Sequence, residues 1–385
     1  MQEKISRIDS HAHFAWPVLF DCLTQTLQKT GADAVCLLAL PGTSRLDSTP
    51  DILCYKLLHP DTVFAFGCLD VTVYETDPAH CGLLFARRAK RLLRMGCDGM
   101  KLLEGKPTLR RRFPVPDFDA PAWEPFWALA ERERIPLLWH VNDPEQFWNP
   151  DAVPAYARNS GWGYGPEDVN NEAQYRQVWN VLIRHPRLNL TLPHLFFLSA
   201  QLPRLAEWLD RFPLLRVDLA PGIELYENLS REPDETRAFF RRYGERIQYG
   251  TDIGGRAVLK ENVTLLDEAE SMRRIEIIRR FLTGEGEREI TADGRYLIGS
   301  LPFTLRGMGF DEELLRKIER DSFLAFVGED SPRRVRIPPL RRYLRRLKRL
   351  LLAREKRTGI PADLRAVEFD LEFLNQYRSR LKRIK

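Results

Sequence analysis

The 385-residue chain lacks long apolar runs, and none approaches the roughly 18 consecutive apolar residues that a membrane span needs. Its first residues, MQEKISRIDSHAHF, contain no apolar stretch of the kind that a secretory signal peptide carries. We therefore expect a cytoplasmic protein without a transmembrane helix.

Cysteine is also scarce, and no two cysteines form a CxxC pair. The six cysteines are Cys22, Cys36, Cys54, Cys68, Cys81 and Cys97. Most lie inside apolar segments, and scattered cysteines in a large domain are typical of buried free thiols in a reducing compartment. A secreted protein with a disulfide framework is the weaker alternative.

Other absences narrow the fold and the function. No Gly-rich phosphate loop follows the first expected strand, which argues against a dinucleotide-binding fold. The chain has no internal repeat, no low-complexity tract and no known DNA-reading motif. Its composition of 44% hydrophobic and 10% aromatic residues is instead typical of a globular protein with a substantial core.

Charge divides the chain into two parts. Residues 331–385 contain 18 Lys and Arg against 5 Asp and Glu, whereas residues 1–330 contain 41 against 49. We expect a mildly acidic domain over residues 1–330 and a basic helical extension over 331–385. A helical apolar stripe in the extension consists of Leu340, Tyr343, Leu344, Leu347 and Leu351.

The extension admits three interpretations. We favour a helix that packs on the main domain or on a second subunit in a homo-oligomer. Its arginine-rich face would alternatively bind nucleic acid or an anionic membrane surface. Nucleic acid is disfavoured because the extension lacks an aromatic platform on which unpaired bases stack.

Eight apolar runs alternate with amphipathic helical patterns along the main domain. The runs cover residues 4–9, 33–40, 63–71, 97–103, 136–141, 188–195, 214–221 and 246–253. Apolar runs separated by amphipathic helices indicate parallel βαβ units whose strands are buried on both faces. Eight such units predict an α/β fold of the (β/α)8 TIM-barrel type. The long loop 142–168, rich in Pro, Gly and Trp, follows the fifth strand and is expected to have a functional role.

Polar residues of the metal-ligand type stand at the carboxyl ends of the predicted strands. They are His11 and His13 on the first strand, His140 on the fifth, His194 on the sixth and Asp252 on the eighth. Alternation along a strand directs both first-strand imidazoles to the same face, and enzymes with this fold place their chemistry at this end.

Packing alone is a poor explanation for this set, because buried polar groups without partners cost a few kcal/mol each. A shared cation explains the convergence better. Imidazoles and a carboxylate suit Zn(II) best, while Mn(II) or Fe(II) would also be accommodated.

The segments IDSHAHF, DGMKLLE, LLWHVND, LPHLFF and YGTDIGG together resemble the amidohydrolase superfamily. The resemblance spans about residues 4–330 and is closest to amidohydrolase family 2, the branch of aminocarboxymuconate semialdehyde decarboxylase, resorcylate decarboxylase and pyrone-dicarboxylate lactonase. Residues 310–328 resemble the helix that closes such barrels. The pattern is specific for the superfamily and poorly specific for the substrate.

The resemblance implies roles for individual residues. It implies that His11, His13, His140 and Asp252 bind one metal ion, and that Asp252 also acts as a general base. His194 would then be free to polarise the substrate or to transfer a proton.

Lys101, at the end of the fourth strand, has three interpretations. Some members of the superfamily carry a carboxylated lysine there that bridges two metals, in which case His194 would be a ligand. We favour one metal, with an unmodified Lys101 holding a substrate carboxylate. Pairing of Lys101 with Glu104 at the rim is equally open, and both residues are candidates for substrate binding.

Weaker candidates lie in the loops. Asn142 and Trp148, with Trp162 and Tyr164, are expected to form a pocket wall or to pack the loop down. Glu224, Tyr226 and Arg256 follow the last two strands without a motif of their own.

The leading hypothesis is a metal-dependent hydrolase that cleaves a C–O or C–N bond of a small carboxylated or cyclic substrate through metal-activated water, with His194 stabilising the oxyanion. The closest alternative is a nonoxidative decarboxylase, in which Asp252 protonates carbon. An alternative from another class is a non-catalytic binding protein that recruits a partner through its basic extension.

Overall fold

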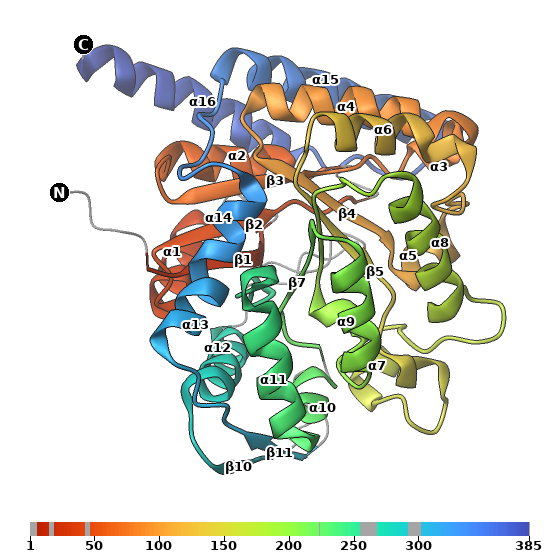
Figure 1. Cartoon of the computed structure of the whole chain (residues 1–385). Helices are drawn as coiled ribbons and strands as arrows, with labels where there is room; N and C mark the ends of the chain where they lie inside the picture. The colour runs from red at the N-terminus through yellow and green to blue at the C-terminus, as the bar shows by residue number, and fades with distance from the viewer. Residues whose placement is uncertain are drawn as a thin grey trace.

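The computed structural model describes residues 6–14, 19–42, 47–222, 224–254, 268–291 and 302–384. A parallel sheet forms the centre, and helices surround it (Figure 1). The strands of this sheet are β1 (Ile8–His13), β2 (Ala34–Leu38), β3 (Val63–Cys68), β4 (Gly99–Gly105), β5 (Leu137–Val141), β6 (Leu190–Leu192), β7 (Leu215–Asp218), β8 (Ile247–Gln248) and β9 (Ile253–Gly254). The helices are α1 (Phe20–Thr30), α2 (Thr49–Leu58), α3 (Val73–Thr76), α4 (Cys81–Met95), α5 (Pro107–Arg112), α6 (Glu124–Arg132), α7 (Ala155–Asn159), α8 (Asn171–Arg184), α9 (Leu202–Arg211), α10 (Leu225–Arg231), α11 (Pro233–Tyr243), α12 (Glu268–Thr283), α13 (Glu312–Arg316), α14 (Ser322–Val327), α15 (Ile337–Thr358) and α16 (Arg365–Ile384).

The sheet closes into a barrel because β8 and β9 are successive segments of one strand position. β8 pairs with β7 and β9 pairs with β1, and every neighbouring pair around the sheet is parallel. Between them, the amide of Ser10 donates to the carbonyl of Tyr249 at 2.9 Å, and the amide of Asp252 donates to the carbonyl of His11 at 2.7 Å. The predicted (β/α)8 barrel is confirmed. The first strand begins at Ile8 and ends at His13, later than the run 4–9 suggests.

A β-bulge in β1 sets the direction of its histidines. Ile8 pairs with Ala34 and His13 pairs with Leu38, so five steps along β1 match four steps along β2. Strict alternation would place Ile8 and His13 on opposite faces of the sheet. The extra residue inverts the alternation, so Ile8 joins the apolar barrel interior while His13 faces the barrel mouth.

Asp9 holds the bulged segment against the closing strand. Its carboxylate accepts from the amide of His11 at 3.1 Å, from the amide of Thr251 at 3.1 Å and from the Thr251 hydroxyl at 2.5 Å. Burial raises the pKa of Asp9 to about 7. These bonds tie β1 to the residue immediately before Asp252.

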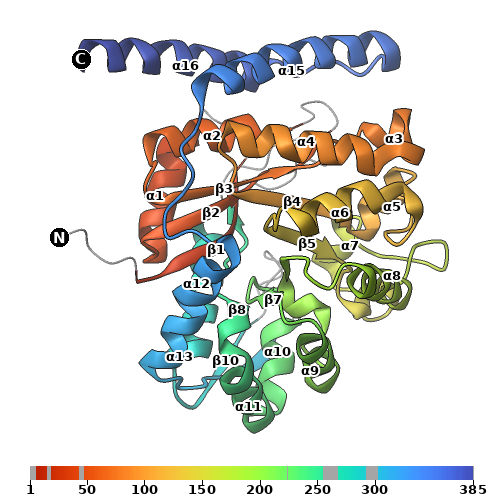
Figure 2. The same cartoon turned by 45° about the horizontal axis from the view of Figure 1, so that its top comes forward.

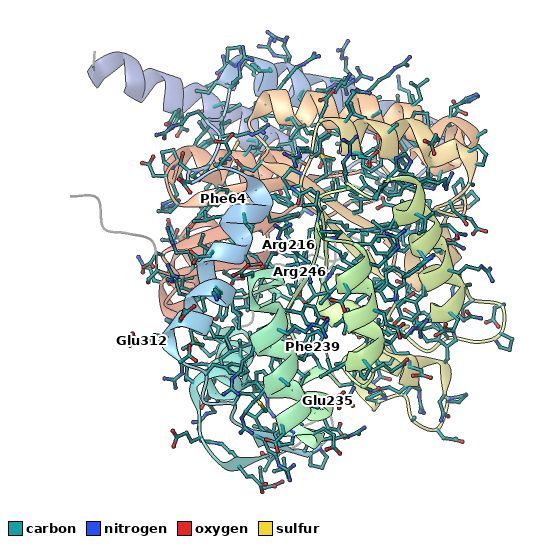
Figure 3. The ribbon with its side chains drawn as sticks, in the orientation of Figure 1. Phe64, Arg216, Glu235, Phe239, Arg246 and Glu312 are labelled. Carbon is teal, nitrogen blue, oxygen red and sulfur yellow. The ribbon has the colours of Figure 1, made fainter. Side chains whose placement is uncertain are left out.

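The barrel interior is apolar at the end opposite the mouth. Its side chains are Ile8, Ala34, Cys36, Leu38, Phe64, Phe66 and Leu138, together with Phe323, Phe326 and Val327 of α14. Phe64, labelled in Figure 3, is one of these side chains. Its ring lies edge-on to that of Phe323 at a centroid distance of 5.1 Å. Helix α14 therefore closes this end of the barrel, where the resemblance places a closing helix.

The C-terminal extension forms helices α15 and α16, which lie along the α2 and α4 side of the barrel (Figure 2). The residues of the predicted apolar stripe, Leu340, Tyr343, Leu344, Leu347 and Leu351, are all buried and belong to the same hydrophobic core as the barrel. Tyr343 donates to Asp47 at 2.5 Å and accepts from Arg88 at 2.9 Å, and Arg88 pairs with Asp47 at 2.8 Å. The extension is thus joined to the barrel by apolar packing and by a buried polar network.

Further features agree with the composition or add to it. All six cysteines are free, and five of them are buried. Within the described ranges, no helix is long and apolar enough to cross a membrane. A short antiparallel pair, β10 (Glu287–Ile290) with β11 (Phe303–Arg306), lies outside the barrel and was not predicted from the sequence.

We predict that Tyr343→Phe lowers the free energy of unfolding by about 1–3 kcal/mol, because it leaves buried polar atoms of Asp47 and Arg88 short of a partner. Chemical denaturation followed by circular dichroism measures the change. Tyr377→Phe is the matched control, since the half-buried Tyr377 on α16 makes one hydroxyl bond, to the Leu57 carbonyl at 3.1 Å. A Tyr343 variant no less stable than this control would show that the polar network does not fasten the extension.

Candidate metal centre

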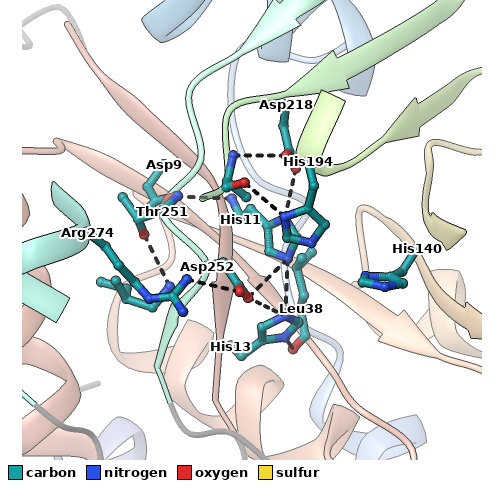
Figure 4. A network of polar contacts seen from close by, with 12 residues as sticks. Asp9, His11, His13, Leu38, His140, His194, Asp218, Thr251, Asp252 and Arg274 are labelled. Carbon is teal, nitrogen blue, oxygen red and sulfur yellow. Dashed lines mark hydrogen bonds and ion pairs between the residues drawn. The ribbon is translucent and has the colours of Figure 1, made fainter. Parts of the chain in front are cut away.

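Three side chains of the metal-ligand type meet at the mouth of the barrel (Figure 4). His11 and His13 lie at the end of β1, and Asp252 lies between β8 and β9. The Nε2 atoms of the two histidines are 3.2 Å apart. Asp252 Oδ1 lies 3.2 Å from His13 Nε2 and 3.5 Å from His11 Nε2.

The outer hydrogen bonds of the two imidazoles determine their tautomers. His13 Nδ1 lies 3.1 Å from the Leu38 carbonyl, and His11 Nδ1 lies 2.8 Å from Asp218 Oδ2. Carbonyl and carboxylate oxygens only accept, so each Nδ1 carries the hydrogen and each Nε2 presents a lone pair. Burial lowers the pKa of both rings below the ordinary value, which favours the neutral form.

The geometry fits a single cation. Two imidazole lone pairs and a carboxylate oxygen face one another without a hydrogen between the imidazoles, an arrangement that is repulsive on its own. A tetrahedral site with bonds of about 2.0–2.1 Å separates its ligand atoms by about 3.3–3.4 Å. The observed separations of 3.2, 3.2 and 3.5 Å match that spacing.

Asp218, which the sequence analysis did not single out, orients this centre. It ends β7, is fully buried, and accepts from His11 Nδ1, from the amide of His194 at 2.8 Å and from the amide of Ala220 at 3.0 Å. Burial alone raises the pKa of a carboxyl group, but the adjacent His11 ring and these donors bring that of Asp218 below its usual value. A carboxylate behind a metal-binding histidine fixes the ring and strengthens the ligand.

Arg274 of α12 holds the other oxygen of Asp252. Its Nη1 lies 3.2 Å from Asp252 Oδ2, and its Nη2 lies 2.9 Å from Glu270 Oε1. The guanidinium is completely buried. It leaves Oδ1 directed at the histidines and favours the ionised form of Asp252.

His194 lies beside His11, with ring centroids 5.4 Å apart. Its Nδ1 donates to the Ala220 carbonyl at 2.9 Å, so a neutral ring has its lone pair on Nε2. Burial lowers the pKa of His194 to about 4. The resting ring is therefore a proton acceptor.

Backbone strain gathers at the same mouth. Among the described non-glycine residues with positive φ are Asn142 at 73°, Asp252 at 50° and the whole turn His194–Phe197 at 49–59°. Left-handed conformations cost about 1–2 kcal/mol for residues with a side chain. Strain of this kind concentrates at functional sites.

The ring of His140 lies next to that of His194, which in turn lies next to that of His11. Its ring centroid lies 5.2 Å from that of His194, and its buried Nε2 has no hydrogen-bond partner. Asp143 Oδ1 is 3.4 Å from this nitrogen, and burial lowers the pKa of His140 to about 3. The structure groups His11, His13 and Asp252 within 4.8 Å but does not bring His140 into that group. Its role as a ligand stays a prediction.

Lys101 is a buried amine without a hydrogen-bond partner. Burial lowers its pKa to about 8, while the carboxylates of Asp218 and Asp252 act in the opposite direction. No ion pair joins it to Glu104, whose Oε2 accepts from the Leu103 amide at 2.8 Å and whose Oε1 has no partner. Burial raises the pKa of Glu104 to about 7.

The loop after β5 packs on itself. Phe147, Val153, Ala157 and Tyr164 form a small apolar cluster with Trp148 and Trp162 packed against it. The Tyr164 hydroxyl donates to Asp143 Oδ2 at 2.5 Å, and Lys106 pairs with Asp143 at 2.8 Å.

Two loop candidates for substrate binding occupy different surroundings. Asn142 is buried, and its Oδ1 accepts from Gln174 at 3.0 Å. The ring of Trp148 lies against Tyr164, with centroids 4.6 Å apart. Trp148 is thus engaged by the loop's own packing.

The remaining candidates are Glu224, Tyr226 and Arg256. Glu224 is buried, neither of its carboxylate oxygens has a partner, and burial raises its pKa to about 7. Tyr226 donates to the Leu219 carbonyl at 2.7 Å, which is a structural contact. Arg256 lies outside the described residues.

The two residues that sequence reasoning missed differ in their signal. Asp218 is the one acid in the run 214–221 and ends β7 at the same end of the barrel as the other candidates, so its position was readable. Arg274 lies on a helix 22 residues beyond Asp252 and has no local signature.

The sequence matches no family model, and no curated protein is significantly similar to it. The fold is similar to that of a crystal structure of an amidohydrolase II, with 12% identity and a TM-score of 0.50 over 84% of this chain and 100% of that one. It is also similar to an uncharacterised TIM-barrel protein from Bordetella bronchiseptica, with 15% identity and a TM-score of 0.50 over 84% and 99%. A 2,6-dihydroxybenzoate decarboxylase from Rhizobium has 14% identity and a TM-score of 0.49 over 84% and 99%. At these identities the first two similarities establish the barrel fold.

We predict that Asp218→Asn weakens metal binding about 10–100-fold, because His11 loses the carboxylate that orients it. Competition with a chromogenic chelator gives the affinity. Asp47→Asn is the control, since it removes an equally buried carboxylate from the network with Tyr343 and Arg88. An unchanged affinity in the Asp218 variant, or an equal loss in both, contradicts the assignment.

Proposed function

We propose that the protein is a metal-dependent hydrolase that cleaves a C–O or C–N bond in a lactone, ester or amide of a small carboxylated or cyclic substrate. The observation that carries this proposal is the convergence of three acceptor atoms from His11, His13 and Asp252 at 3.2–3.5 Å. A non-catalytic binding protein has no evident use for this cluster together with a neighbouring proton acceptor, His194.

His11, His13 and Asp252 would hold the cation, and His140 would complete the set through its unpartnered Nε2. Zn(II) suits these ligands best, with Mn(II) or Fe(II) as alternatives. Such a cation makes a coordinated water acidic enough to react near neutral pH and polarises a carbonyl group.

Asp252 is the general base in this proposal. Its Oδ1 lies among the ligand atoms, where attacking water must lose a proton. The buried Arg274 stabilises the ionised carboxylate. An ionised Asp252 suits hydrolysis, whereas a decarboxylase needs a protonated Asp252 that delivers its proton to carbon. This ion pair is the reason for preferring the hydrolase over the decarboxylase.

His194 takes over the proton that Asp252 removes from water and transfers it to the leaving group. Its hydrogen-bonded Nδ1 and free lone pair on Nε2 make the neutral ring an acceptor. The sequence-based hypothesis had His194 stabilise an oxyanion directly, which requires the protonated ring. In our proposal the ring becomes a cation only after it takes up a proton, and it then stabilises negative charge and protonates the leaving group.

Lys101 gives the site its preference for substrates that carry a carboxylate. A buried amine without a partner, near the Asp218 and Asp252 carboxylates, is suited to bind a carboxylate of the substrate when charged. The alternative is carboxylation of Lys101 and a second metal. The two differ in mass and in metal stoichiometry.

We expect the metal-loaded protein to hydrolyse members of a lactone and ester panel and to release no CO2 from ortho-hydroxybenzoates. Asp252→Asn should lower kcat about 10²–10⁴-fold, while the exposed control Asp234→Asn leaves it unchanged. Release of CO2 by wild type would establish the decarboxylase instead. Absence of turnover on both panels by metal-loaded protein would favour the binding protein.

We predict that Lys101→Met lowers kcat/KM about 10–100-fold for a carboxylated substrate, because a hydrogen bond to a charged group contributes about 1.5–3 kcal/mol. The uncharged methyl ester of the same substrate should lose little. Intact mass and metal analysis should show an unmodified chain with one metal. An equal loss on both substrates, with two metals in wild type, would instead assign Lys101 to a bridging role.

A further inference from the structure

A groove of about 480 Å³ lies on the outside of the barrel, between α4 and α15. Figure 2 shows α15 running along α4 at this face. The lining residues are Arg87, Lys90, Arg91, Arg94, Pro339, Arg342, Tyr343 and Arg346. Six of these eight carry a positive charge, and none is acidic.

The positive charge of the groove is not neutralised by the protein. Helix α4 contains five Lys and Arg and no acidic residue, and α15 contains nine against a single acid, Glu355. Within the part of the chain that the structure describes, none of the five arginines that line the groove forms an ion pair, and Lys90 reaches Glu133 only at 3.7 Å.

The two helices bring these like charges together across the groove. Arg91 of α4 is half-buried, and Arg346 of α15 faces it. Burial lowers the pKa of Arg91, and the guanidinium of Arg346 lowers it further. Two arginines that repel each other in a groove without a counter-ion indicate a site that is complementary to an anion.

We propose that this groove binds a small anion that carries several linked phosphate groups. The site is separate from the metal centre, which opens at the mouth of the barrel. The proposal therefore does not depend on the reaction assigned to that centre.

The side chains favour phosphate as the ligand. Five of the six cations are arginines, whose planar guanidinium donates two parallel hydrogen bonds to phosphate oxygens. Arg87, Arg91 and Arg94 follow one another along a single stripe of α4, which is about 10 Å long at 1.5 Å per residue. A chain of phosphates reaches all of them at once, whereas a single carboxylate engages only one or two.

The surroundings of the groove argue against a nucleic acid strand or a membrane surface. Tyr343 is the one aromatic residue that lines the groove, and it is buried with its hydroxyl bonded to Asp47, so no ring is open for base stacking. The apolar face of α15 is buried against the barrel and is not available to enter a bilayer. A small polyphosphate uses the charges without needing either.

Binding would fasten the extension to the barrel. The anion would contact α4 of the barrel and α15 of the extension together, and a ligand that binds only the folded arrangement stabilises it. The thermal midpoint of the protein should therefore rise with polyphosphate concentration.

The test is isothermal titration calorimetry of the full chain with sodium tripolyphosphate at about 0.1 M salt, where charges more than about 10 Å apart are largely screened. We expect one tripolyphosphate per chain. A double variant, Arg342→Glu with Arg346→Glu, should weaken binding at least about tenfold, because it reverses two charges of the groove.

The matched control is Arg345→Glu with Arg349→Glu. These residues are exposed on the same helix with the same spacing but do not line the groove. The control carries the same change in net charge and should bind within about threefold of wild type. Because all four arginines are exposed, both variants are expected to fold, which circular dichroism and Tm verify.

A parallel titration with ATP shows whether a nucleoside contributes to binding. Equal affinity for ATP and tripolyphosphate means that the phosphates alone are recognised, and tighter binding of ATP means that the nucleoside contributes. In either case the groove variant must lose affinity for the anion. The proposal is overturned if wild type binds neither anion or if the control loses as much as the groove variant. Binding only to a single-stranded oligonucleotide or to anionic vesicles overturns it as well.

Discussion

The mouth of the barrel is organised around a repulsion between three acceptor atoms. His11 Nε2, His13 Nε2 and Asp252 Oδ1 face one another at 3.2–3.5 Å, and the two imidazole nitrogens have no hydrogen to share. The opposite side of each group keeps this arrangement in place, because the second nitrogen of each ring donates outward and Arg274 holds the second oxygen of Asp252. A cation at the centre would attract all three acceptor atoms and outweigh their mutual repulsion, since a bound metal ion is often the largest local charge in such a site. The outer partners are therefore as much a part of the centre as the three ligands.

The barrel brings these groups together through two local departures from ideal geometry, a bulge in β1 and a left-handed turn after β6. The bulge in β1 lets the strand contribute Ile8 to the apolar interior and His13 to the polar mouth, which strict alternation forbids. Asp9 ties that bulge to the backbone just before Asp252. The left-handed turn from His194 to Phe197 positions its first residue at the price of strained backbone. The apolar interior around α14 supplies the stability against which such strain is tolerated.

Much of the fold was predictable, because strands buried on both faces appear in the sequence as continuous apolar runs, and amphipathic helices appear as apolar residues with helical spacing. His11, His13 and Asp252 were predictable for a related reason: a polar residue that ends an apolar strand run is costly unless it has a function. Asp218 carried the same signal and was overlooked. Arg274 and the bulge in β1 were not readable, because a helix residue that reaches a strand end and a one-residue shift in register depend on tertiary packing. The position of a residue at a strand end does not tell how far its side chain lies from the others at the mouth. His140 faces the mouth next to His194 but lies outside the group formed by His11, His13 and Asp252.

The C-terminal extension is connected to the barrel more deeply than its charge suggests. Charge composition separates residues 331–385 from the rest, yet Tyr343 reaches a buried network in which Arg88 also donates to the carbonyl of Cys68 at 2.7 Å. Cys68 is the β3 partner of Lys101 on β4. A continuous set of contacts therefore runs from Tyr343, which lines the basic groove, to the strand that carries the buried amine. Because packed interiors have low compressibility and transmit strain, we expect a displacement of α15 to be felt at β3 and β4. Removing the extension would thus expose apolar surface and also release the support of these two strands.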